Sequence, residues 1–195
     1  MSDVHCPARL IVARHGQAEY ESGEMTPSGG SLTALGRDQA RALGERLRGE
    51  RVAAVVCSEL SRAVQTAEIA AGVLGLRVRV RERLQEFPAG DFLGGTFDHH
   101  FFDPLFLAWL AGDLDVGVPG GETGRETAER VLGVLDDVAD GFRGETVLVV
   151  THGGVLLALW GAIAPGSPVA PAVDGVENCA SYVFERDSDG WCVGR

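Results

Sequence analysis

Three short stretches of the chain are almost continuously apolar and rich in β-branched residues. They are Arg9–Ala13, Ala53–Cys57 and Thr146–Val150, with the sequences RLIVA, AAVVC and TVLVV. Because none alternates between apolar and polar residues, the pattern predicts central strands that are covered on both faces. Ala180–Arg186 is a fourth candidate strand, and the alternating Arg77–Arg81 predicts an edge strand with one wet face.

Segments with helical spacing separate these strands. Thr33 can cap a helix, Ser61 can cap a second, and a third precedes Thr146. Their apolar positions are, in order, Leu35, Ala42, Leu43 and Leu47; Ala63, Ala67, Ala70 and Leu74; and Ala128, Val131, Leu135 and Val138. Strands that alternate with helices predict an α/β fold, here a three-layer αβα sandwich around a mostly parallel sheet.

An aromatic-rich segment, Phe97–Leu110, interrupts this alternation. Its sequence, FDHHFFDPLFLAWL, predicts a helical lid over one end of the sheet. We expect a single domain over residues 1–195, with residues 87–121 as the lid insertion. The phenylalanines fit a hydrophobic core best, and otherwise an apolar wall against the alcohol part of a substrate.

Composition narrows the possible partners. The 195 residues are 45% hydrophobic and 23% charged, which suits one globular domain. The 17 basic and 28 acidic side chains give a net charge of −11, which argues against nucleic acid and anionic membranes as partners. No apolar run is long enough to span a bilayer, and the N-terminal residues lack a signal-peptide pattern. Four scattered cysteines without a CxxC motif predict reduced thiols, so we expect a cytoplasmic protein.

Each of the three apolar strands leads directly into reactive residues. Arg14-His15-Gly16 follows the first, Ser58–Arg62 the second, and Thr151–Gly154 the third. Ligands of open α/β sheets bind beyond the carboxyl ends of the strands, where helix N-termini also present free N–H groups. Taken alone, an arginine and a histidine after a strand are more simply explained as a surface pair, and His152 as a core histidine bonded to the backbone. Their coincidence at three strand ends predicts a site for a phosphate-sized anion.

Six motifs between Leu10 and Gly154 strengthen this interpretation. In order they are LIVARHGQ, LTALGRDQA, CSELSRAVQTA, LQEF, PGGET and VTHGG. This order resembles the histidine phosphatase superfamily, which is also called phosphoglycerate-mutase-like. The resemblance implies phosphoryl transfer through a phosphohistidine at His15. That chemistry needs a neutral imidazole with one free nitrogen, and a backbone carbonyl on the other nitrogen would fix the tautomer. Arg14, Arg62 and His152 would then hold the phosphoryl oxygens.

The resemblance assigns further roles around this centre. Glu86, in LQEF, would be the proton donor, which requires a raised pKa. Gln17 and the backbone N–H of Gly153 would contact the phosphate. Ser58 and Thr66 are expected to support the loop and helix that carry Arg62, and Glu122 to cap or orient the site without taking part in the chemistry. No metal and no organic cofactor is implied.

Residues 18–30 depart from the family pattern. This loop contains three acids, no base and no asparagine at the position expected for phosphoglycerate mutases, so it argues against mutase activity and bisphosphate substrates. The sequence favours a metal-independent phosphomonoesterase that acts on a small phosphorylated metabolite. The alternatives are a phosphoglycerate-type phosphomutase, a non-catalytic phospho-ligand-binding relative, and a metallohydrolase using His99 and His100. Adjacent helical histidines point in different directions and make poor metal ligands. Nothing fixes the oligomeric state, and a homodimer stays open.

Overall fold

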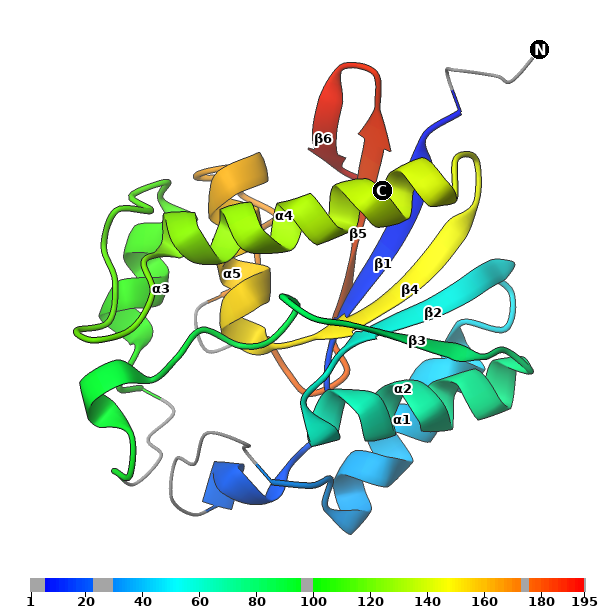
Figure 1. Cartoon of the computed structure of the whole chain (residues 1–195), viewed down its shortest axis with the longest axis horizontal. Helices are drawn as coiled ribbons and strands as arrows, with labels where there is room; N and C mark the ends of the chain where they lie inside the picture. Colours follow the sequence, from blue (N-terminus) through cyan, green and yellow to red (C-terminus); the bar gives the residue numbers. More distant parts are fainter. Residues whose placement is uncertain (1–5, 23–29, 96–99, 173–175, 195) are drawn as a thin grey trace.

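The computed structural model describes residues 6–22, 30–95, 100–172 and 176–194. Its centre is a six-stranded sheet with the order β3-β2-β4-β1-β5-β6 (Figure 1). The strands are β1 Ala8–Arg14, β2 Val52–Ser58, β3 Val78–Arg81, β4 Thr146–Thr151, β5 Ser181–Asp187 and β6 Gly190–Val193. Strands β1 to β4 are parallel to one another, whereas β5 pairs antiparallel with β1 and forms a hairpin with β6. The predicted mostly parallel sheet is confirmed.

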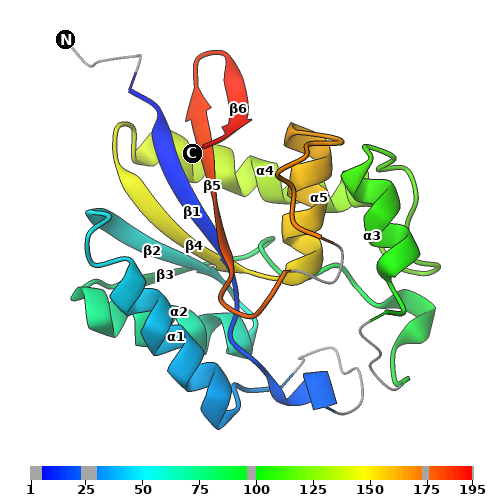
Figure 2. The ribbon, with the colours of Figure 1, turned by 180° about the vertical axis from the view of Figure 1, so that it is seen from behind.

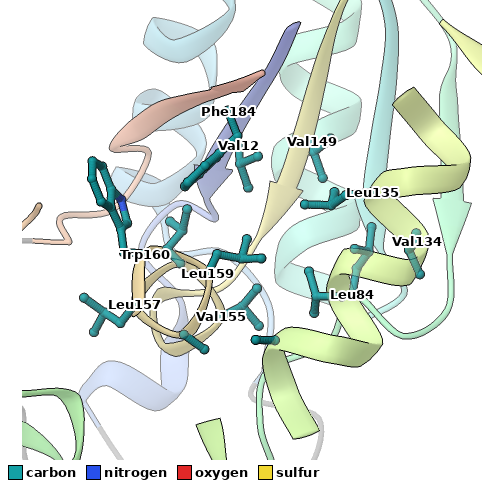
Figure 3. Close-up of a cluster of buried hydrophobic side chains, with 14 of the residues drawn as sticks. Val12, Leu84, Val134, Leu135, Val149, Val155, Leu157, Leu159, Trp160 and Phe184 are labelled. Atoms are coloured by element: carbon teal, nitrogen blue, oxygen red, sulfur yellow. The ribbon is translucent and has the colours of Figure 1, made fainter. Parts of the chain in front are cut away.

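Helices cover both faces of this sheet. Helices α1 (Ala34–Arg46) and α2 (Ser61–Leu74) lie against one face, and α4 (Gly124–Gly141) and α5 (Gly153–Ile163) lie against the other (Figures 1 and 2). Alternate strand residues point to opposite layers. Leu10, Val12, Val147 and Val149 belong to the core beneath α4 and α5, while Ile11, Ala13, Leu148 and Val150 belong to the core beneath α1 and α2. Figure 3 shows part of the first core. The strands are therefore apolar throughout because both of their faces are buried.

The helix patterns were predicted with mixed success. Helix α4 buries all four predicted positions and begins with a capping box between Thr123 and Glu126. In α1 the predicted face is partly wrong, because Leu35 is 53% exposed and Ala42 is also exposed. This helix instead buries Gly36, Ala40, Leu43 and Gly44. Close packing against α2 explains why small residues occupy this buried face, since a Cβ on Gly44 would lie 2.8 Å from the Cβ of Val73 in α2.

Of the two predicted N-cap residues, Thr33 of α1 is confirmed and Ser61 of α2 is wrong. The hydroxyl of Thr33 accepts the N–H of Gly36, so this predicted cap of α1 is confirmed. Ser61 is not the cap of α2, since the N-cap residue is Leu60 and makes no side-chain capping bond. The hydroxyl of Ser58, at the end of β2, instead accepts the N–H of Leu60.

The segment between β3 and α4 carries a short helix, α3 (Asp103–Leu110), which packs on α5. The Phe87 ring makes edge-to-face contacts with Phe102 and Trp109, each at a centroid distance of 5.4 Å, and all three side chains are buried. These aromatic residues are therefore core, whereas Phe101 is half exposed. Residues Phe97 and His99 lie outside the described part of the chain. The domain bounds and the extent of the insertion stay predictions.

The four cysteines, all in the described part of the chain, are thiols and form no disulfide, and burial raises the pKa of Cys57 and of Cys179 to about 12. Across the described ranges, no helix combines the length and apolar character needed to cross a membrane.

Candidate active site

The register of the sheet aligns the carboxyl ends of its three central strands. Arg14 of β1 lies opposite Thr151 of β4, and Cys57 of β2 lies opposite Val150. The residues that follow each strand therefore meet at one edge. The rings of His15 and His152 are 5.2 Å apart between centroids, and the Nε of Arg62 is 3.0 Å from Nε2 of His15. The structure thus brings together the residues that the sequence placed at three separate strand ends.

His15 is held in a single, defined orientation. Its Nδ1 lies 2.7 Å from the carbonyl oxygen of Gly16, and because a carbonyl can only accept, Nδ1 carries the proton. The Nε2 atom therefore presents its lone pair to Arg62. Burial, together with the charges of Arg62 and Arg14, holds the pKa of His15 well below its usual value. At neutral pH the ring is an uncharged imidazole with an unprotonated Nε2.

Arg62 lies in the first turn of α2 and is only 4% exposed. The helix dipole disfavours a cation there, but the Tyr20 ring lies beneath the guanidinium, 4.9 Å from ring centroid to Cζ. Thr66 ties this turn to the loop after β1. Its hydroxyl donates to the carbonyl of Arg62 and accepts the N–H of Gly16, so it supports the site as predicted.

Two buried nitrogens face the site without a hydrogen-bond partner among the described residues. They are Nε of Arg14 and Nδ1 of His152. The other His152 nitrogen, Nε2, lies 2.9 Å from the hydroxyl of Ser58. Burial and then the charge of Arg62 hold the pKa of His152 well below its usual value. Buried polar groups without partners are costly. An anion can accept from Nε of Arg14, and from Nδ1 of His152 in the tautomer in which the Ser58 hydroxyl donates to Nε2.

Glu86 closes the site at the N-terminus of α5. Its carboxylate accepts the N–H groups of Gly154 and Val155, each at 3.0 Å. Burial raises the pKa of Glu86, although the N–H of Gly154 acts in the opposite direction. The backbone N–H of Phe87 also donates to this carboxylate, at 3.3 Å. A Cβ on Gly154 would come within 2.3 Å of the Phe87 ring and 2.8 Å of a Glu86 oxygen, so this turn requires glycine.

The remaining predicted residues lie nearby in different roles. The side-chain oxygen of Gln17 accepts the Thr33 hydroxyl at 2.8 Å, so this part of Gln17 is engaged with the start of α1. Gly153 is the first residue of α5 and lies against the Arg14 side chain. Glu122 pairs with Arg130 at 2.9 Å, and Arg130 donates to the carbonyl of Arg83. Glu122 thus braces the segment that leads to Glu86.

Three residues around Arg14 were not predicted: Tyr20, Glu21 and Asn178. Tyr20 and Glu21 lie in a short 3-10 helix, Glu19–Ser22, and Glu21 pairs with Arg14 at 3.0 Å. Asn178 comes from the segment before β5 and donates to Glu21 and to the carbonyl of His15. The sequence showed Glu21 only as one acid of an acidic loop, and residues 23–29 of that loop lie outside the described part. No sequence signal marked Asn178.

The alternative metal site would rest on His99 and His100. His100 pairs with Asp103 at the exposed start of α3, while His99 is outside the described residues. Among the residues with defined positions, no group of three or more His, Cys, Asp or Glu side chains is arranged to hold a metal ion.

Comparison with known proteins agrees with this fold. The sequence model of the histidine phosphatase superfamily, branch 1, matches residues 10–195, and the chain belongs to this superfamily. It is 32% identical over 195 residues to phosphoglycerate mutase-like protein 4 of Arabidopsis thaliana, covering 95% of this chain and 83% of the relative. It is 34% identical over 190 residues to the glucosyl-3-phosphoglycerate phosphatase of Mycolicibacterium vanbaalenii, covering 90% and 82%.

Solved structures show the same fold. The native structure of a mycobacterial glucosyl-3-phosphoglycerate phosphatase superposes with a TM-score of 0.77 at 30% identity, covering 96% of this chain and 97% of that one. The superfamily relatives thus include both phosphatases and phosphoglycerate-mutase-like proteins.

Proposed function

We propose that the protein is a metal-independent phosphomonoesterase that hydrolyses a small phosphorylated metabolite through a phosphohistidine at His15. The observation that carries this proposal is the tautomer of His15. Its Nδ1 proton is donated to the Gly16 carbonyl, and burial beside two arginines keeps the ring neutral, so that Nε2 carries the lone pair that would attack phosphorus. A histidine that merely filled the core would not need its acceptor nitrogen directed at a buried guanidinium.

The first step forms a bond between Nε2 of His15 and phosphorus and breaks the ester P–O bond. Arg14, Arg62 and His152 donate to the phosphoryl oxygens as negative charge redistributes among them. The leaving oxygen takes a proton from Glu86, whose pKa is raised by burial and is raised further by the charge of a bound phosphate.

The second step returns the enzyme to its starting state. Water attacks the phosphohistidine, and the Glu86 carboxylate accepts one proton of this water. The P–N bond breaks, its electron pair returns to Nε2, and inorganic phosphate leaves. Every proton and phosphoryl group is then accounted for without a metal or an organic cofactor.

The direct test is phosphate release from p-nitrophenyl phosphate in the presence of EDTA. Wild-type protein is compared with His15→Ala and with His100→Ala, which removes an exposed histidine at the start of α3. We expect hydrolysis by wild type and His100→Ala, and none by His15→Ala. Hydrolysis that survives in His15→Ala, or that disappears with EDTA, would contradict the proposal. Transfer of the phosphoryl group to an added alcohol instead of water would indicate the mutase alternative.

A further inference from the structure

We propose that Glu21 is a positioning residue that holds Arg14 in the geometry needed for phosphoryl transfer. The inference rests on the proposed function and extends it to a carboxylate that the chemistry itself does not use. The starting observation is that Glu21 lies in the acidic turn after His15, yet its side chain is only 6% exposed and is directed at Arg14.

Both oxygens of Glu21 have polar partners in this position, an ion pair on one and hydrogen bonds on the other. Its Oε2 pairs with a terminal nitrogen of Arg14 at 3.0 Å. Its Oε1 accepts the side-chain amide of Asn178 at 3.0 Å and the N–H of Ala18 at 3.2 Å. Three donors therefore converge on one side chain. Only a carboxylate can accept on both oxygens, because a glutamine would present an amide donor on one side.

The second terminal nitrogen of Arg14 is held from another part of the chain. It donates to the carbonyl oxygen of Val176 at 2.6 Å. With both terminal nitrogens engaged, the guanidinium has little freedom to rotate. Its Nε remains buried without a partner in the described structure, beside Gly153 at the start of α5. Glu21 and Val176 thus direct the remaining donor of Arg14 toward the position between His15 and α5.

Asn178 connects His15 to the clamp on Arg14, which is formed by the contacts of Glu21 and Val176 with its guanidinium. Its amide donates both to Glu21 and to the backbone carbonyl of His15, at 3.0 and 3.3 Å. Displacement of Glu21 would therefore remove the ion pair with Arg14 directly, and would reach the backbone of His15 indirectly, through Asn178 and through Ala18. Misplacing a catalytic group by about 1 Å can lower a rate about 100-fold.

The charges near His15 show that the Glu21 carboxylate opposes the binding of an anion, so its presence needs an explanation. Arg14 and Arg62 are opposed by Glu21 and Glu86, all of them in or beside the site. A carboxylate this close weakens the attraction of the site for a phosphate dianion. Its benefit must therefore come from ordering Arg14, since Arg side chains lose much rotamer freedom when they are fixed.

The test compares Glu21→Gln with Glu19→Gln, a matched change in the same turn. Glu19 is exposed, and its carboxylate accepts the N–H of Ser31. We expect Glu21→Gln to lower kcat/KM for p-nitrophenyl phosphate by about 10- to 100-fold. We expect Glu19→Gln to change it less than about twofold, as is usual for surface substitutions. Wild-type kcat/KM in Glu21→Gln would overturn the inference and leave the proposed function intact.

A double-mutant cycle with Arg14→Ala separates positioning from a general structural effect. If Glu21 acts through Arg14, then Glu21→Gln has little further effect once Arg14 is removed. If the two losses multiply in full, Glu21 does not act through Arg14 and the inference fails. Should Glu21→Gln not fold, as judged by its thermal unfolding curve, Glu21→Asp, which keeps the charge but shortens the side chain, replaces it in the cycle with the same expectation.

A binding measurement keeps the inference independent of turnover. Orthovanadate adopts a five-coordinate geometry that resembles the transition state, whereas inorganic phosphate resembles the product. We expect Glu21→Gln to weaken orthovanadate binding in calorimetry more than phosphate binding. Equal changes for both anions would overturn the inference. If wild-type protein binds both anions but hydrolyses no ester, the proposed function fails while the role of Glu21 at Arg14 can still be measured.

Discussion

The Nε of Arg62 donates to Nε2 of His15 across 3.0 Å, so the lone pair that would attack phosphorus is engaged by a guanidinium in the free protein. A phosphoryl group entering the site must take over this donor. The same motion releases the lone pair and transfers the Arg62 charge to the phosphoryl oxygens. In the proposed mechanism, Arg62 therefore holds His15 neutral and correctly oriented until substrate arrives.

Replacement of Arg62 tests this relationship. Arg62→Ala should lower kcat/KM about 100- to 1,000-fold, the cost typical of losing one donor to a transition-state oxyanion. Arg62→Lys should recover little, because an ammonium ion cannot reproduce the planar set of donors. Both kinetic constants are obtained from initial rates of p-nitrophenyl phosphate hydrolysis. Activity close to wild type in either variant would show that Arg62 is structural.

The pKa of His15 should respond to the same substitution. The positive charge of Arg62 is one of the causes that depress this pKa, so Arg62→Ala should raise it. The acidic limb of the kcat/KM profile should then move to higher pH, because His15 becomes protonated sooner as pH falls. NMR titration of the imidazole gives the same quantity directly. A pKa unchanged in Arg62→Ala would mean that Arg62 does not depress it and that burial and Arg14 control the ring.

Folding stability should depend on pH through His15 and His152. Both are buried and have a depressed pKa, so below about pH 6.5 the unfolded chain binds protons that the folded chain does not. The free energy of unfolding should therefore fall as pH decreases, by about 1.4 kcal/mol per pH unit for each histidine, until each folded-state pKa is reached. Urea unfolding between pH 7.5 and 5.5 measures this slope.

The control for this slope is a comparison of variants. His152→Gln should have a shallower slope than wild type, whereas His100→Ala, at an exposed position, should keep the wild-type slope. The burial-raised pKa of Glu86 acts with the opposite sign, stabilising below about pH 4.5 and losing that effect as pH rises. Identical slopes in wild type and His152→Gln would mean that His152 is not a buried neutral group.

Glu86→Gln should reveal the role of the proton donor. An alkyl phosphate needs a proton on its leaving oxygen, whereas p-nitrophenolate leaves without one. We expect a loss of about 100-fold or more for an alkyl phosphate, at the low end of general acid catalysis, and a much smaller loss for p-nitrophenyl phosphate. Equal losses on the two substrates would remove Glu86 from the acid role.

Two adjacent glycines at the start of α5 offer a matched pair of substitutions. Gly153→Ala places a Cβ in ordinary contact, 3.5 Å from the Arg14 side chain, and should be tolerated. Gly154→Ala places a Cβ 2.3 Å from Phe87 and should displace Phe87 and Glu86, with loss of activity and a lower unfolding temperature. Activity assays and thermal unfolding of both variants would contradict this packing if Gly154→Ala behaved like Gly153→Ala.

The central strands could be predicted because a strand that is buried on both faces has apolar residues at successive positions. β1, β2 and β4 each begin and end within one residue of the predicted stretch. β6 was missed, since four residues with a single neighbouring strand carry too little pattern. The α1 face was partly wrong because its contact with α2 uses small residues, which hydrophobic periodicity does not mark.

The candidate site shows the same limit. His15, Arg62 and His152 lie directly after or near strand ends, so chain order and a parallel sheet were enough to bring them together. The clamp on Arg14 could not be predicted, because Glu21 and Asn178 are 157 residues apart and neither lies in a regular strand or α-helix. Their contact depends on the path of two loops across the sheet edge, which local sequence does not specify.

The stereochemical course at phosphorus tests the phosphohistidine at His15 most directly. A phosphorothioate ester made chiral with oxygen isotopes is hydrolysed in isotopically labelled water, and the configuration of the thiophosphate product is determined. Attack by His15 followed by attack by water inverts phosphorus twice. The account therefore predicts net retention of configuration. Net inversion would show that water attacks the substrate in a single step and would contradict a covalent intermediate on His15.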